Sequence, residues 1–291
     1  MAENRLNDNC GGTVAKKPEK TKTLFHSNPV ISRLGRVTEQ ANDGNTASYG
    51  GITVKSLYFV LITFIGLFAY IIVNSNIFTT QQQFSYTYEN TFKISVSLEE
   101  MMWVGGFLII GLITQLLSCF IVKIIPVTGT IYSFSQGFVI SFLAFKVLSG
   151  YEYLAVLALV ITALVVAIMA VLYTSGVIKP NKKFRTVMFT LFTTMIIISI
   201  LIFICSFIPF TAPFVASLMS NLFFSVSLSL ISIIIAALFL ISDFAVIDHT
   251  VQNSLPSKYE WTAAFGLVFT IIWLYVKILD LVIRIFASSK S

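Results

Sequence analysis

The chain has 291 residues, of which 56% are hydrophobic and 11% charged, and its formal net charge is +6. A soluble domain is about half apolar and about a quarter charged, so one water-soluble core is excluded. The basic residues lie in short stretches between long apolar runs. This pattern is typical of membrane topology and does not indicate nucleic-acid binding.

Residues 1–50 form the first predicted unit. They are polar and rich in Lys, Asn, Gly and Thr, with no helical or strand period. Such a segment cannot bury enough apolar area to offset its ordering entropy. We expect a disordered, basic cytoplasmic tail, followed by a transmembrane domain over residues 51–291.

The rest of the chain contains runs long enough to cross a bilayer, which takes about 20 apolar residues. The sequence therefore predicts an all-α, polytopic membrane protein. Its seven transmembrane helices are expected near residues 56–73, 102–125, 131–148, 153–174, 187–208, 218–241 and 261–286. A tight turn at residues 126–129 is expected between the second and third.

The basic residues predict the orientation. Of the 19 Lys and Arg, 14 fall on the side of the amino terminus and 4 on the other side, with Lys277 set aside. Because cytoplasmic loops carry an excess of Lys and Arg, we expect a multi-pass protein of the cell membrane. The amino terminus is expected to be cytoplasmic and the carboxyl terminus outside.

The residues that could carry enzyme or metal chemistry are few. Three cysteines are scattered, and His26 and His249 are the only histidines. Ligands for a metal need to be grouped, so we predict no metal site, no cofactor and no enzyme.

Polar residues follow one face of the predicted sixth helix. The members of this stripe recur at intervals of three and four residues and are Ser225, Ser229, Ser232 and Ala236. If the helix continues with the same period, Asp243 falls on the same face. We expect the stripe to face the bundle interior with Asp243 at its cytosolic end, and Asp248 to lie well round the helix. The alternatives are close packing of the small residues and an ordinary interfacial Asp243.

A second stripe follows the predicted seventh helix. Its members are Gly266, Thr270, Trp273, Lys277, Asp280 and Arg284. Charged side chains are costly in hydrocarbon and usually face a partner, a cavity or water. We interpret this helix as a central one that lines a polar seam. Alternatively, Lys277 and Arg284 extend to the outer interface.

Several local motifs resemble bacterial members of the Bax-inhibitor family, the YccA-like group. They are Asn-Pro-Val-Ile-Ser-Arg at 28–33, Tyr-Gly-Gly-Ile-Thr-Val-Lys at 49–55, Gly-Val-Ile-Lys at 176–179 with Lys-Phe-Arg at 183–185, and Lys-Tyr-Glu-Trp-Thr-Ala-Ala-Phe-Gly-Leu at 258–267 with Trp-Leu-Tyr at 273–275. The resemblance runs from about residue 28 to the end and implies seven helices with the last in the centre.

The resemblance also implies an ion site built from two acidic residues, one on helix six and one on helix seven. Asp243 matches the first position. Lys277 stands where the family places the second acid, and Asp280 stands one turn later, where a basic residue often follows. Gln136 replaces a frequent Glu.

The exchange of an acid for Lys277 leaves two arrangements open. If Asp243 meets Lys277, an internal ion pair would exclude calcium and flatten any pH response. If Lys277 pairs with Asp280, at i and i+3, Asp243 stays available to titrate. Lys123 is another candidate cation for Asp243, with a purely topological lysine as the alternative.

Two functions follow from this resemblance and from the stripes. The first is a membrane ion leak for calcium or protons, or a stress-protective regulator, with Asp243, Lys277 and Asp280 in the gate. The second is a non-conducting interaction protein that modulates a membrane quality-control protease.

Overall fold

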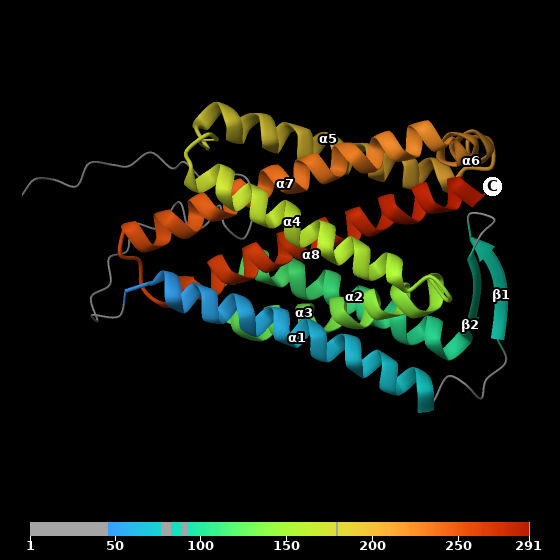
Figure 1. The fold of residues 1–291 in the computed structure, drawn as a ribbon, viewed down its shortest axis with the longest axis horizontal. Helices are drawn as coiled ribbons and strands as arrows, with labels where there is room; N and C mark the ends of the chain where they lie inside the picture. The colour runs from blue at the N-terminus through green and yellow to red at the C-terminus, as the bar shows by residue number, and fades with distance from the viewer. Residues whose placement is uncertain (1–45, 77–82, 89–91, 179, 291) are drawn as a thin grey trace, which may run out of the picture.

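The computed structural model describes residues 46–76, 83–88, 92–178 and 180–290 (Figure 1). The predicted disordered tail therefore lies outside the described residues up to position 45. In chain order the elements are α1 Tyr49–Asn76, β1 Gln83–Tyr88, β2 Phe92–Ser97, α2 Leu98–Phe120, the short turn η3 Val122–Ile124, α3 Ile125–Phe142, the π-helical turn η4 Leu143–Val147, α4 Tyr153–Thr174, α5 Lys182–Phe207, α6 Ala212–Ser220, α7 Leu222–Gln252 and α8 Lys258–Lys290.

The predicted all-α, polytopic architecture is confirmed. Within the described residues, seven helices are long and apolar enough to cross a membrane. Figure 1 shows them running side by side, with the α7–α8 turn at one end of the bundle and the β1–β2 hairpin at the other. We call these the turn end, with residues 253–257, and the hairpin end.

The sixth spanning helix differs from its predicted range of 218–241. Asn221 has extended backbone angles, and its Oδ1 accepts a hydrogen bond from Phe224 N at 3.1 Å. It therefore caps a new helix, and the short α6 precedes it. At the other end α7 continues to Gln252, so the predicted helix end near residue 241 was wrong and Asp243 lies within the helix. Nine residues, or about 13 Å, separate Asp243 from Gln252.

The turn between α2 and α3 also lies elsewhere than predicted. Pro126 sits in the first turn of α3, where a missing N–H costs nothing because that group has no partner within the helix. The turn is made by Ile121 and η3 instead. The tight hairpin remains, but residues 126–129 are helical.

Glycines bring α1 and α3 into backbone contact. A Cβ on Gly137 would lie 1.9 Å from the carbonyl oxygen of Thr63, and a Cβ on Gly66 would lie 2.2 Å from that of Phe134. Small residues allow such close approach of membrane helices. The pair of glycines therefore fixes how these two helices cross.

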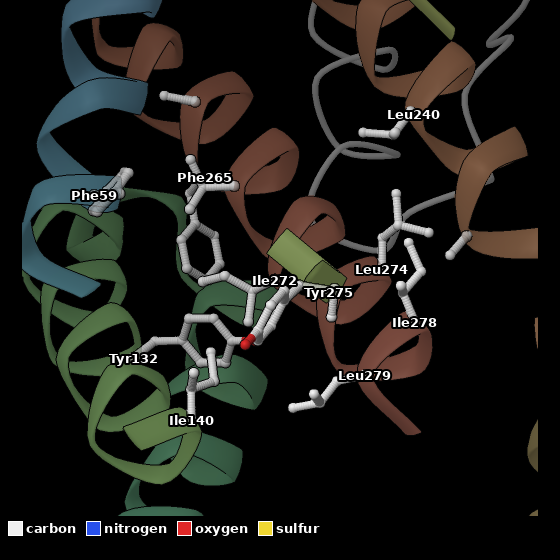
Figure 2. Packing of buried hydrophobic residues seen from close by; sticks show 14 of the residues in the cluster. Phe59, Tyr132, Ile140, Leu240, Phe265, Ile272, Leu274, Tyr275, Ile278 and Leu279 are labelled. Carbon is white, nitrogen blue, oxygen red and sulfur yellow. The ribbon is translucent and has the colours of Figure 1, made fainter. Parts of the chain in front are cut away.

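The last helix, α8, runs through the middle of the bundle, between α7 on one side and α1 and α3 on the other (Figure 1). It packs against α1, α3, α4 and α7. Figure 2 shows its apolar residues, including Phe265 and Tyr275, meeting Phe59 of α1 and Tyr132 of α3. The central position implied for the last helix agrees with this packing.

Two features at the hairpin end were not predicted. Strands β1 and β2 pair antiparallel, with Gln83 opposite Ser97. In addition, α3 ends in the π-helical turn η4, which carries Lys146. A π turn pairs residues i and i+5, and such turns are rare and frequent at functional sites.

Candidate functional site

The polar stripe of α7 lies in the bundle interior, where it was expected, and one of its serines contacts α8. Ser225, Ser229, Ser232 and Asp243 are buried, and Ser229 Oγ donates a hydrogen bond to Asp280 Oδ2 of α8 at 2.8 Å. Asp243 is only 1% exposed. A carboxyl group thus lies inside the bundle, on a helix that spans the membrane.

The Ser229–Asp280 hydrogen bond fixes the register of the two antiparallel helices. Asp243 lies fourteen residues beyond Ser229 on α7, and the same step back along α8 from Asp280 leads to Gly266. The ring contact between Phe239 and Trp273, with centroids 6.0 Å apart, agrees with this register within one turn. Asp243 is therefore level with Gly266 to within one turn.

This register separates Asp243 from Lys277. Lys277 lies eleven residues beyond Gly266 on α8, which corresponds to about 16 Å along the helix. Among the side chains that the structure describes, no ion pair within 4.0 Å joins Lys277 to Asp243 or to Asp280. Neither of the two pairings considered for Lys277 is formed.

Asp280 is held by other groups. Both of its oxygens accept from Arg284 Nε at 3.1 Å, and Ser229 donates to one of them. The Arg284 side chain is 19% exposed and that of Asp280 is 33% exposed. Towards the hairpin end, α8 therefore carries an i,i+4 ion pair tied to α7, well away from Asp243.

Asp248 joins three helices near the turn end. Its Oδ1 accepts from the Tyr49 hydroxyl of α1 at 3.0 Å, and its Oδ2 accepts from the Tyr173 hydroxyl of α4 at 2.5 Å. The residue was predicted only as a supporting one. Its two tyrosine partners come from distant positions in the sequence, which periodicity within one helix does not reveal.

The remaining supporting residues lie outside this region. Lys123 is an exposed residue of η3, and within the described residues no ion pair joins it to Asp243. Gln136 lies between α3 and α2, where its Nε2 would be 2.9 Å from a Cβ on Gly111. Gln136 is thus a contact between these two helices.

A carboxylate at the turn end was missed by the sequence analysis. Glu260 is 4% exposed and forms a salt bridge with Lys55 of α1. The Lys55 Nζ also lies 5.3 Å from the centroid of the Trp261 ring. These residues belong to the two motifs at 49–55 and 258–267, so two separate parts of the family resemblance are in direct contact. Their joint presence was the available signal.

A second missed carboxylate lies at the hairpin end. Glu100 is 0% exposed, accepts a hydrogen bond from the Tyr70 hydroxyl, and lies 3.2 Å from Lys146 Nζ. Ser97 caps α2 by accepting from Glu100 N at 3.1 Å. The Ser-x-x-Glu spacing resembles a capping box, whose Glu would bond back to the backbone. Here the side chain reaches α1 and η4 instead.

The described residues contain no group of three His, Cys, Asp or Glu side chains that could hold a metal ion. The acidic side chains named above occupy separate positions, and basic or tyrosine side chains contact Asp248, Asp280, Glu100 and Glu260. The arrangement suits transient contact with an ion or proton transfer at a buried carboxyl group.

Seven spanning helices in the described residues, with α8 in the middle of the bundle and buried carboxyl groups on the α7–α8 hairpin, define a polytopic helical membrane protein. The model of one family, described as Bax inhibitor 1 like, matches residues 28–287. The chain therefore belongs to the Bax inhibitor 1-like family, and the resemblance drawn from its motifs is confirmed. No curated protein and no solved structure matches the chain.

Proposed function

We propose that this protein is a pH-sensitive ion leak of the cell membrane and that Asp243 is its gating carboxyl group. The observation that carries the proposal is a 1% exposed Asp243 on the face of α7 that packs against α8. An ionisable side chain at such a position is expensive and is a candidate functional group for that reason.

The register of the α7–α8 hairpin supports the titration of Asp243. At about 16 Å, Lys277 is too far away to form an internal ion pair with it. The residue that breaks the family's two-acid pattern therefore does not neutralise the remaining acid. Of the two arrangements considered from the sequence, the register favours an Asp243 that can take up a proton.

The ion is proposed to be a proton or calcium. One carboxyl group is sufficient for a proton, whereas a bound calcium ion takes six to eight oxygen ligands. Calcium would therefore pass Asp243 through transient contacts. The turn end is proposed to face the cytoplasm, because most of the Lys and Arg of the sequence fall in the tail and the loops on that side.

The test is flux into proteoliposomes that contain a calcium dye or a pH dye, measured on either side of neutrality. The wild type should conduct with a pH-dependent rate, and Asp243→Asn should reduce flux to that of empty liposomes or abolish its pH dependence. Lys277→Glu is the matched control: it changes the charge of the neighbouring helix about 16 Å away and should leave the pH response in place.

The contrary result is a leak whose rate and pH dependence survive in Asp243→Asn, which would remove Asp243 from the gate. If the wild type does not conduct at all, the channel proposal fails. The regulatory interaction protein, acting on a membrane protease, then becomes the better hypothesis.

A further inference from the structure

The chain that leads into α1 is attached to the α7–α8 turn. Thr46 forms an antiparallel bridge with Pro256, and Ala47 N donates to Leu255 O at 2.7 Å. Ala47 and Leu255 are 4% and 2% exposed. We call residues 46–49 the strap, because this short segment connects to both helices of the hairpin.

The strap reaches α8 through Glu260. Ser48 donates from its N at 2.8 Å and from its Oγ at 3.3 Å to Glu260 Oε1, while Lys55 pairs with the other oxygen. There is no room for a side chain at Gly51, since a Cβ there would lie 2.3 Å from Oε1. The buried carboxylate is thus enclosed by the strap and the first turns of α1.

The strap reaches α7 through Asp248. The Tyr49 hydroxyl donates to Asp248 Oδ1 at 3.0 Å, and Tyr173 of α4 binds the other oxygen. Asp243 lies five residues away along α7, or about 7 Å. The contacts of the strap therefore bear on the part of the hairpin that contains the proposed gate.

We infer that the strap is an autoinhibitory contact, which holds the turn end of the α7–α8 hairpin closed until it is released. An ion that passes Asp243 towards the turn end requires α7 to move relative to α8 or α1. The strap opposes that motion because it is bonded to the last turns of α7, to the turn, and to the first turn of α8. This inference rests on the proposed function and names the regulation of its site.

The first experiment fastens the strap with a disulfide. Ala47→Cys and Leu255→Cys are introduced together after Cys10, Cys119 and Cys205 have been replaced by Ser. Opposite residues of an antiparallel bridge lie about 5 Å apart, within the range that a disulfide spans. Oxidation should reduce the leak of the proteoliposomes to background, and reductant should restore it. Ala47→Cys alone, treated in the same way, is the control.

The second experiment weakens the strap. Glu260→Gln removes the charge that Lys55 binds and should raise the leak several-fold, while Glu152→Gln, a matched change at an exposed residue of the hairpin end, should not. Backbone hydrogen exchange at residues 246–262 should rise in Glu260→Gln and remain unchanged in the hairpin end. This readout does not require conduction.

The outcomes separate the two proposals. If Asp243→Asn abolishes the leak but the oxidised disulfide variant conducts like its reduced form, the inference about the strap is wrong and the gate remains. If no variant conducts, the proposed function fails, and hydrogen exchange decides about the strap. Equal exchange in wild type and Glu260→Gln overturns the inference.

Discussion

At the scale of single residues, glycine decides how closely helices can approach. Gly66 and Gly137 allow α1 and α3 to touch through their backbones. Gly105 of α2, in contrast, has no atom within 4 Å of the position that a Cβ would occupy. The same residue type therefore has opposite tolerance at two places in the membrane domain.

Gly137→Ala should lower stability, because the new methyl group would lie 1.9 Å from Thr63 O and would push α1 and α3 apart. The expected cost is about 1 to 3 kcal/mol, as for other overpacked sites, and is read from thermal unfolding in detergent. Gly105→Ala is the control and should leave stability unchanged or raise it by up to about 1 kcal/mol. Equal effects of the two changes would contradict the backbone contact.

The stripes could be predicted from the sequence because winding fixes which residues share a face. That argument placed Ser229 on the stripe of the sixth helix and Asp280 on the stripe of the seventh, and the structure joins these two residues. It did not provide the depth of Asp243 relative to Lys277, which depends on where both helices begin and end. It also missed the contact between Lys55 and Glu260, which are 205 residues apart in the sequence.

At the scale of elements, the hairpin end is held by a buried charge pair. Glu100 in the first turn of α2 contacts Tyr70 at the end of α1 and Lys146 in η4. Three parts of the membrane domain, α1, α2 and η4, therefore meet at one fully buried carboxylate. Such a pair adds little net stability, but leaving one member alone is costly.

Lys146→Met should destabilise the protein by about 3 to 5 kcal/mol, because it leaves the charge of Glu100 buried without its cation. Glu100→Gln should cost less, since Lys146 is 16% exposed and can extend to water or lipid head groups. The double variant should be more stable than Lys146→Met alone. Thermal unfolding of all four proteins forms a double-mutant cycle, and strictly additive costs would show that the pair is not coupled.

Helix existence was predictable, but helix ends were not. The long apolar runs identified all seven spans, because length and hydropathy suffice for that. The break at Asn221 depends on one capping side chain, which an apolar window averages out. Pro126 was interpreted as part of a turn, although the first helical turn accepts proline.

At the scale of the whole molecule, the two ends of the bundle differ in chemistry. The turn end carries the strap, Asp248 and Glu260, while the hairpin end carries Glu100 and Lys146. Both ends join α1 to later helices through buried or half-buried carboxylates. Between them Asp243 lies buried inside the bundle, so the proposed ion path would have to pass a tethered end.

The orientation of the bundle can be tested at the two ends of α4. Ser149 and Ser175 are exposed and flank this helix at the hairpin end and the turn end. After the three native cysteines are replaced by Ser, Ser149→Cys should react with a membrane-impermeant maleimide in intact cells. Ser175→Cys should react only after permeabilisation, because basic loops stay in the cytoplasm. The reverse pattern of labelling would invert the proposed topology.

The extra residue in the π turn η4 has an evolutionary consequence. Lys146 lies within this turn, so deleting one residue from η4 would change the local backbone that presents its side chain to Glu100, with no change in side-chain identity. The ion pair between Glu100 and Lys146 therefore depends on the number of residues at the end of α3 as well as on their identity. A lineage that lost one codon in this turn would need a different cation for the same carboxylate.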